Sequence, residues 1–309
     1  MISFKGLQVN LPYDEARLRP TPNLVLDIAA EESMASGPHD LGVQVEMEEF
    51  LDCFGGNAIF KSGPALAERV AQGAPLLVTS RLDVGEEEVR ASEALLSEDE
   101  RKRASRFVFD RDKRRFVVAR AGLRKLLAHQ LRLDPSSVEL KYSSTGKPAL
   151  RDQSAIADLR FNVSHSEDVA VFAFARGRDI GIDVEFVRAI PDADGIAARF
   201  FSLRENEAYF ALGARDRPQG FFNCWTRKEA FIKAIGDGLS HPLDRFDVSL
   251  APRDPARILS VDGVPGEDCG WTVHSFFPSP GFVAAVVTQT SIDDRLKTLG
   301  QAPDVAMVN

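Results

Sequence analysis

The sequence predicts an α+β protein made of two similar halves in tandem. At 309 residues the chain is long enough for two ordinary domains. From Pro75 onward, patterns typical of a strand, helices and three strands follow one another, and a second series of strand, helices and strands begins at Ile180. Because the order of elements repeats, we expect a functional site at the junction, where residues of both halves would meet.

The composition is that of a folded globular protein. Hydrophobic residues make up 44% of the chain and charged residues 27%, which argues against wholesale disorder. The N-terminal segment lacks the apolar core of a signal peptide, and no window reaches the roughly 18 apolar residues of a membrane span. We therefore expect a cytoplasmic protein with no membrane partner.

The cysteines suggest no covalent or zinc framework. Cys53, Cys224 and Cys269 are widely separated and form no CxxC pair. Neither a disulfide framework nor a zinc site is expected from this pattern. They are expected to be small core or surface residues in a reducing compartment.

Charge is distributed unevenly along the chain. The net charge of -8 argues against general nucleic-acid binding. Residues 101–125, however, contain eleven Lys or Arg and two Asp, whereas residues 1–75 contain eleven acidic and five basic residues. The basic segment is therefore where anion binding is expected first.

Breaker residues and periodicity divide the chain into four parts. Residues 1–75 hold Pro and Gly breakers with only short apolar stretches between them, and they form an N-terminal extension without an assigned function. Residues 76–179 form the first half and residues 180–290 the second half, which carries the candidate metal site. Residues 291–309 form a C-terminal tail.

The first half begins with the strand-like run PLLVTSRL. Ser97, followed three residues later by Glu100, matches a capping box and predicts the start of a helix. A second helix is predicted over 114–131, where apolar residues recur at spacings of three and four. The runs VELKYSS, RFNVS and VAVFAFA are strand-like.

The second half begins with IGIDVEFV as a predicted strand. Helical patterns follow near 193–213 and 219–235. The runs RFDVSL, RILSVD, WTVHSFF and FVAAVVT are strand-like and complete the series.

Two carboxylates lie in the segment GIDVE. Because side chains alternate along a strand, Ile182 and Val184 would be buried while Asp183 and Glu185 share the opposite face. Two carboxylates that point the same way can hold a cation. The same pattern also describes a half-buried strand with a solvated acidic face.

A third carboxylate lies in a predicted helix. Glu229 and Lys233 are four residues apart, so they share one helical face with Phe222, Trp225 and Ile232. An exposed ion pair is the alternative, but the apolar neighbours predict partial burial, where a charge requires a partner. A metal bound by the carboxylate and a phosphate bound by the ammonium would satisfy both charges.

Oxygen ligands are typical of hard cations such as Mg²⁺. Asp183, Glu185 and Glu229 form such a set, and Cys224 points away from Glu229 on a helical wheel, so zinc is not indicated. The chain lacks a GxxxxGK[ST] loop, a GxGxxG after a strand and a GxSxG elbow, which argues against ordinary nucleotide-binding folds and serine hydrolases. The pattern therefore favours a metal-held phosphate site assisted by arginine.

Two further segments could contact a phosphate. Ser164 and His165 follow a strand and precede a turn, where a hydroxyl and an imidazole could donate to phosphate oxygens, although a single histidine is as easily structural. The turn Gly146-Lys147-Pro148 could expose its lysine to a phosphate or could be only a well-formed loop.

Several segments together resemble the Sfp-type 4'-phosphopantetheinyl transferase superfamily. GIDVE, followed about forty residues later by WTRKEAFIKA, is characteristic of that family. The resemblance extends from about Pro75 to Thr288 and implies the 4'-phosphopantetheinyl transferase fold, two tandem pseudo-twofold-related α/β halves that bind coenzyme A between them. The segments that carry it are, in order, RFVFDRDKRRF, GKP, FNVSHS, GIDVE, RFFSLRE, CWTRKEAFIKAIGDGL and HPLDRFDVSL.

The resemblance also implies an activity. The phosphopantetheine arm of coenzyme A would pass to a serine of an acyl or peptidyl carrier protein, releasing adenosine 3',5'-bisphosphate, as in holo-[acyl-carrier-protein] synthases (EC 2.7.8.7). Mg²⁺ would be the cofactor, coenzyme A the co-substrate, and the protein a monomer with no nucleic-acid partner. Carrier proteins are typically acidic, so the basic segment 101–125 could also steer their approach.

Individual roles follow from position in the motifs. Asp183, Glu185 and Glu229 match the magnesium ligands, and Lys233 matches the lysine that contacts the diphosphate; Glu229 and Lys233 would act directly in catalysis. Glu205, in RFFSLRE, is the candidate base for the carrier serine, or equally an exposed glutamate at a helix start. The implied coenzyme A contacts are Lys233, Arg103, Arg106, Arg115, Lys147, Ser164 and His165.

One position departs from the family pattern. Glu100 stands where some relatives carry a lysine for the 3'-phosphate of coenzyme A. Arg101 and Arg103 could supply that contact instead.

Two other functions compete with this interpretation. A non-catalytic module that binds coenzyme A or a carrier protein would require loss of a metal ligand or of the lysine, and all are present. A metal-dependent nuclease could use the same acidic cluster and the basic segment, but Lys233 does not stand at the short ExK spacing from Glu229, and the chain is acidic overall.

Overall fold

The computed structural model describes residues 75–144, 146–151, 158–236 and 241–290, and the backbone of two short antiparallel strands, β1 (Ile2–Phe4) and β2 (Leu7–Val9). The predicted C-terminal tail and nearly all of the predicted N-terminal extension lie outside these residues.

The first half is built on a three-stranded antiparallel sheet, in the order β3 (Leu76–Arg81), β7 (Val169–Arg176) and β6 (Leu159–Ser166). Apolar side chains of the long helix α5 (Asp110–Leu131) pack against one face of this sheet. The shorter elements are α3 (Glu86–Ala94), α4 (Glu98–Ala104), the 3-10 helix η3 (Pro135–Ser137) and a paired β4 (Leu140–Tyr142) and β5 (Pro148–Leu150).

The second half repeats this plan. Its main sheet has the order β12 (Trp271–Phe276), β13 (Phe282–Gln289) and β8 (Ile180–Phe186), and the long helix α8 (Arg217–Ile235) packs against it. The remaining elements are α6 (Ala193–Phe200), α7 (Leu203–Ala211), η5 (Leu243–Arg245) and a small sheet of β9 (Phe246–Val248), β10 (Ile258–Val261) and β11 (Val264–Pro265).

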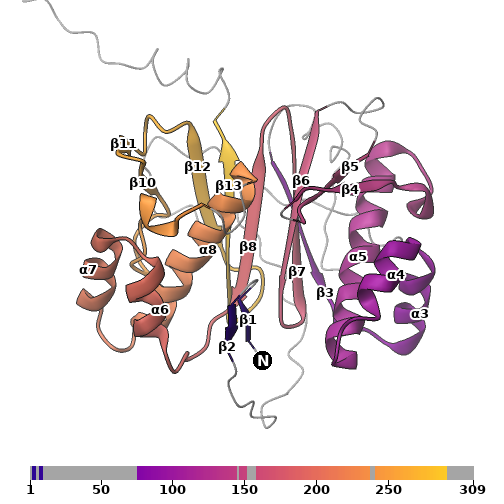
Figure 1. Ribbon diagram of the computed structural model, residues 1–309, viewed down its shortest axis with the longest axis horizontal. Coiled ribbons are helices and arrows are strands. Elements are labelled where there is room, and N and C mark those ends of the chain that lie inside the picture. The colour runs from indigo at the N-terminus through magenta and orange to yellow at the C-terminus, as the bar shows by residue number, and fades with distance from the viewer. Residues whose placement is uncertain are drawn as a thin grey trace, which may run out of the picture.

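The two sheets lie between two layers of helices (Figure 1). Helices α3–α5 cover one side and α6–α8 the other. Between the sheets, apolar side chains such as Leu77, Val171 and Ile182 form one buried cluster. The predicted α+β architecture of two similar halves is confirmed. Among the described residues, no helix combines the length and the apolar character that crossing a membrane would need.

One helix, α3, is not predicted from the sequence. Its nine residues, EEEVRASEA, include three glutamates in the first turn, and Ser92 is its one buried residue. Acidic residues suit a helix N-terminus, but such a helix offers no broad apolar stripe for periodicity to detect.

In both halves, the glutamate of a capping box also forms a buried ion pair with the long helix. In the first half, the predicted capping box of Ser97 and Glu100 is confirmed, and Glu100 also accepts from Arg124 on α5 at 2.6 Å. In the second, Ser202 caps α7 with Glu205, which pairs with Lys228 on α8 at 2.7 Å. Both cations also donate to carbonyl oxygens in the segment after their helix. Glu100 is therefore part of a framework that both halves share.

Candidate active site

The candidate site forms where α8 packs against β8. At Gly181 an added Cβ would lie 2.1 Å from the carbonyl oxygen of Ala230 and 2.3 Å from the amide nitrogen of Ala234. Only glycine therefore lets the helix lie this close to the strand. The close approach brings Lys233, on α8, to the strand residues that follow Gly181.

Asp183 and Lys233 form an ion pair at this junction. Asp183 is 3% exposed, and Ser164 Oγ donates to its Oδ1 at 2.9 Å. The ammonium of Lys233 also donates to the carbonyl oxygen of Ile182 at 3.1 Å and to Ser164 Oγ at 3.3 Å. A charge this far removed from water requires such partners. The structure thus brings three of the predicted site residues into contact.

The second carboxylate oxygen of Asp183 provides a test for a metal. Oδ2 is buried and has no hydrogen-bond partner in the part of the chain that the structure describes. Leaving a buried charged acceptor unsatisfied is costly, and a cation would satisfy it. The carboxylates of Asp183, Glu185 and Glu229 are oxygen donors of the kind Mg²⁺ prefers, so the residues present fit this ion.

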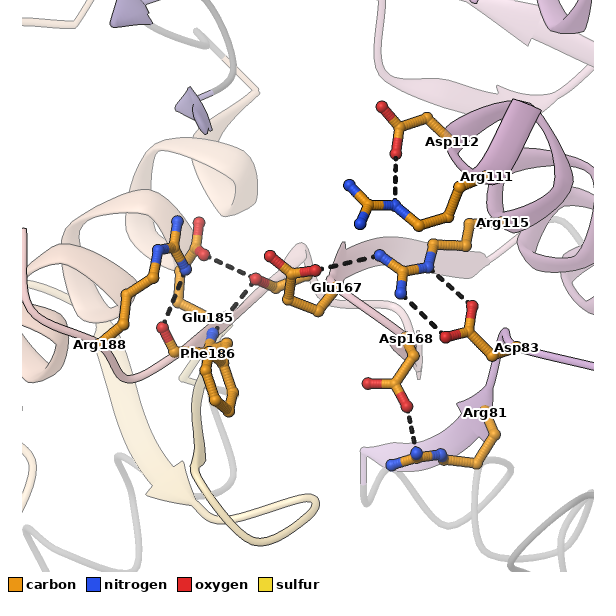
Figure 2. Close-up of polar contacts among 11 residues, drawn as sticks. Arg81, Asp83, Arg111, Asp112, Arg115, Glu167, Asp168, Glu185, Phe186 and Arg188 are labelled. Carbon is orange, nitrogen blue, oxygen red and sulfur yellow. Dashed lines mark hydrogen bonds and ion pairs between the residues drawn. The ribbon is translucent and has the colours of Figure 1, made fainter. Parts of the chain in front are cut away.

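Glu185 lies two residues beyond Asp183 on the same face of β8. Ser166 Oγ, on β6, donates to Glu185 Oε2 at 2.8 Å, and Figure 2 shows this carboxylate beside the turn that follows β6. Glu185 is partly exposed, whereas Asp183 is buried. The predicted alternation is confirmed, because Ile182 and Val184 lie in the apolar layer between the sheets.

Glu229 lies on α8 one turn before Lys233 and is 6% exposed. Among the described residues, no three Asp, Glu, His or Cys side chains are arranged so that they could hold a metal ion. In this structure the ammonium of Lys233 is the cation beside Asp183. Binding of one metal by all three carboxylates therefore stays a prediction.

Strands β6 and β8 are joined by side chains where their sheets meet. Asn162 Oδ1 accepts from the amide of Ile182 at 2.9 Å, and Ser166 Oγ accepts from that of Phe186 at 3.2 Å. Ser164 Oγ accepts from the amide of Val184 at 3.4 Å. These side chains replace the backbone carbonyls that would pair with β8 in a continuous sheet. We call this row the β6 seam: Asn162, Ser164 and Ser166.

The seam contains two residues, Asn162 and Ser166, for which the sequence predicts no individual role; of the two, Ser166 contacts a candidate metal ligand. Polar side chains at every second position of β6, alternating with the apolar Phe161 and Val163, are the signal that could have found them. The sequence does not show which strand lies against this polar face, because that is decided by how the two halves pack together.

Lys147 reaches α8 and β8 instead of projecting from its turn. Its ammonium donates to the carbonyl oxygen of Lys233 and, at 3.4 Å each, to those of Ala234 and Ile180. Burial lowers the pKa of Lys147. The C-terminal end of a helix carries partial negative charge, so a cation stabilises it. The structure therefore gives Lys147 a helix-capping role that the sequence does not predict.

Replacing Lys147 with methionine is expected to lower the free energy of unfolding by about 1–3 kcal/mol, because buried carbonyl groups lose their donor. Urea unfolding measures this. The control is Lys141→Met, an exposed lysine of the same region, with an expected change within about 0.5 kcal/mol. A loss of coenzyme A affinity with unchanged stability would instead support the predicted phosphate contact.

A cavity of about 300 Å³ opens beside Lys147. Its lining combines aromatic, aliphatic and cationic side chains, a combination suited to a ligand with an apolar ring and negative charges. It reaches Gly236, at the end of α8. The other lining residues include Lys141, Tyr142, Pro148, Arg160 and Phe161.

Arg115 is engaged by carboxylates of its own half. It donates to both oxygens of Asp83, at 2.8 and 2.9 Å, and to Glu167 at 3.1 Å (Figure 2). The bidentate bond lowers the pKa of Asp83. Arg120 and Arg124 likewise face Glu100. Part of the basic segment therefore neutralises acidic side chains of the protein itself. The guanidinium of Arg115 is already bound by two carboxylates, which argues against its predicted contact with coenzyme A.

Three other predicted coenzyme A contacts are exposed. Arg103 lies on α4 with its guanidinium 5.5 Å from the ring centroid of Phe116, and Arg106 follows the helix. His165 alternates with Ser164 on β6, so the two side chains point to opposite faces of the sheet. Arg103, Arg106 and His165 are accessible to an anion, whereas the hydroxyl of Ser164 is buried against Asp183.

Glu205, the predicted base, is 1% exposed. Its carboxylate pairs with Lys228 and accepts from the backbone amides of Ser202 and Val248, both at 2.8 Å. Burial raises the pKa of Glu205, against the opposing effect of Lys228 and of these amides. A base must reach the proton that it removes, so this enclosed position argues for a structural role in place of the catalytic one.

Comparisons with known proteins agree with the two halves. Residues 84–176 match the family model described as 4'-phosphopantetheinyl transferase, N-terminal, and residues 179–287 match that of the 4'-phosphopantetheinyl transferase superfamily. The boundary between the matches falls between β7 and β8, where the first structural half ends.

Three relatives illustrate the similarity. The chain is 38% identical over 205 residues to 4'-phosphopantetheinyl transferase HetI of Nostoc sp., covering 66% of this chain and 83% of the relative. For 4'-phosphopantetheinyl transferase Sfp of Bacillus subtilis the identity is 34% over 203 residues, covering 66% and 86%. A phosphopantetheinyl transferase of Thraustochytrium sp. is 31% identical over 212 residues, covering 64% and 69%.

Proposed function

The chain belongs to the 4'-phosphopantetheinyl transferase superfamily, and from this premise we propose that it transfers the phosphopantetheine arm of coenzyme A to a serine of an acyl or peptidyl carrier protein. The observation that carries the proposal is the junction of β8 and α8, where the buried, half-satisfied carboxylate of Asp183 lies against Lys233. The finer assignment that we propose is the holo-[acyl-carrier-protein] synthase reaction (EC 2.7.8.7).

In this reaction the hydroxyl oxygen of the carrier serine attacks the phosphorus that bears the pantetheine arm. The bond from that phosphorus to the bridging oxygen breaks, adenosine 3',5'-bisphosphate leaves, and the serine proton passes to a base. Such a transfer depends on positioning and on neutralising the charge of the phosphate oxygens. The protein therefore needs cationic groups and a metal site more than a nucleophile of its own.

Asp183, Glu185 and Glu229 are the residues that would hold Mg²⁺. Bound there, the ion would neutralise negative charge on the diphosphate. Lys233 would bind the same diphosphate, because its side chain lies beside Asp183 and is 14% exposed. With Mg²⁺ held by Asp183, the carboxylate would no longer depend on the Lys233 ammonium for neutralisation, and Lys233 could bind the substrate.

We propose that the cavity beside Lys147 receives the adenosine end of coenzyme A. Its aromatic lining, with Tyr142 and Phe161, suits the adenine ring, and the exposed Lys141 supplies positive charge at its edge. Arg103, Arg106 and His165 are the exposed groups proposed for the phosphates. Glu205 and Arg115 are left out of this assignment, since each is engaged by a partner of opposite charge.

The test is to incubate the protein with coenzyme A, Mg²⁺ and a panel of apo carrier proteins from fatty-acid, polyketide and nonribosomal-peptide systems. One phosphopantetheine is expected on the serine of at least one carrier, because all the residues proposed for the metal and the diphosphate are present in the chain. Intact-protein mass spectrometry measures the addition.

Two controls accompany it. Chelation of Mg²⁺ and a carrier whose acceptor serine is replaced by alanine should both abolish the added mass. Binding of coenzyme A and carrier without transfer to any carrier would contradict the proposal and favour a non-catalytic binding module.

A further inference from the structure

The β6 seam does more than join two strands. Asn162, Ser164 and Ser166 all accept a hydrogen bond from a backbone amide of β8. The two serines differ from the asparagine, because each also donates its hydroxyl proton to a carboxylate of β8. A hydroxyl that is fixed by an amide on one side is oriented on the other, so it holds the carboxylate in one direction.

Ser166 carries this role for Glu185. The donated bond from Ser166 Oγ to Glu185 Oε2 is 2.8 Å, and the accepted bond from the amide of Phe186 is 3.2 Å. Ser166 is 9% exposed, so water has little access to replace it. Glu185 is partly exposed and has a longer side chain than Asp183, so more conformational freedom must be restricted before it can bind a metal, and a hydrogen-bond partner restricts it.

The position of Ser166 is set by the first half of the protein. The turn that follows it contains Glu167, whose φ of 46° is in the left-handed region, and Asp168. Arg115 on α5 binds Glu167 at 3.1 Å, and Arg81 pairs with Asp168 (Figure 2). Two cations of the first half therefore anchor the end of β6, and through Ser166 they fix a carboxylate of the second half.

We propose that Ser166 is a positioning residue that orients Glu185 for binding of Mg²⁺ with coenzyme A. The inference rests on the proposed function, since it takes Glu185 as a metal ligand. Partners that orient a metal ligand through a hydrogen bond typically change metal affinity by about 10–100-fold when removed. Loss of the Ser166 hydroxyl, in the first half, is therefore expected to weaken metal binding by Glu185, in the second half.

The experiment measures coenzyme A binding by calorimetry at increasing Mg²⁺ concentrations, on the wild-type protein and on Ser166→Ala. The alanine variant is expected to need about ten-fold or more Mg²⁺ for half-saturation. Ser166→Thr, which keeps the hydroxyl, is expected to remain near wild type. Ser166→Cys keeps the size but donates weakly, and it carries the test if the alanine variant fails to fold.

Asn162→Ala is the matched control. It removes a seam bond of the same kind without touching a carboxylate, so it should lower the thermal unfolding temperature while Mg²⁺ half-saturation stays within about two-fold of wild type. Thermal unfolding without metal separates the two effects for every variant.

Each outcome decides a separate point. A folded Ser166→Ala, or Ser166→Cys in its place, with wild-type Mg²⁺ dependence overturns the positioning role while the proposed function stands. An Asn162→Ala variant that loses Mg²⁺ affinity as strongly as Ser166→Ala also overturns it, because the seam would then act only through strand packing. A wild-type protein whose binding of coenzyme A ignores Mg²⁺ overturns the proposed metal site and the inference with it.

Discussion

Replacing Glu229 with glutamine is expected to reduce phosphopantetheine transfer by about a thousand-fold or more, while the protein stays folded. Glutamine has the shape of glutamate, so the packing of this buried position on α8 is retained. Its amide lacks the negative charge that a hard divalent cation requires. Initial rates of transfer to an apo carrier protein measure the effect, and circular dichroism verifies the fold.

The control for this substitution is Glu207→Gln, the same change at an exposed position of the neighbouring helix α7. It should leave the transfer rate unchanged. If Glu229→Gln transferred at the wild-type rate, Glu229 could not be a metal ligand of the reaction, and the metal site would reduce to the carboxylates of β8.

Replacing Glu205 with glutamine is expected to lower the free energy of unfolding by about 3–5 kcal/mol, because Lys228 would be left as an uncompensated buried charge. The side chains of the pair are 1% and 0% exposed, and their charged atoms are 2.7 Å apart. Denaturant unfolding measures the loss. Transfer activity at a temperature where the variant is folded should remain within a few-fold of wild type, because the enclosed carboxylate does not reach a substrate.

The double variant Glu205→Gln with Lys228→Met separates charge from shape. Removing both charges should restore much of the stability that the single variant loses, since a buried pair can be replaced by uncharged groups at little cost. The catalytic role predicted from the sequence requires the reverse pattern, in which Glu205→Gln is as stable as wild type and inactive.

Local features of the fold could be predicted from the sequence because they depend on neighbouring residues. The alternation of GIDVE places Asp183 and Glu185 on one face, and the pattern of Ser97 and Glu100 starts a helix. Ser202 and Glu205 show the same capping pattern, so the segment RFFSLRE also predicts a local structural role for Glu205. The i to i+4 spacing likewise places Glu229 and Lys233 on one face of α8.

Which group neutralises each charge could not be predicted in this way. Arg115 and Lys147 look like phosphate ligands in the sequence, but one faces Asp83 and the other the end of α8. Such partners lie far apart along the chain, and a pattern of a few residues contains no information about them. Helix α3 could not be predicted because its apolar periodicity is weak, and tertiary packing stabilises the segment as a helix.

The sequence by itself determined the two-part plan, the order of most elements and the acidic residues of the candidate site. It did so because backbone periodicity and capping act over one or two turns of chain. Only the tertiary structure decided that Lys233 pairs with Asp183, that Glu205 is enclosed with Lys228, and that Ser166 holds Glu185. A carboxylate in low dielectric takes the donor or cation that packing brings to it, and that packing is set by contacts between remote strands and helices.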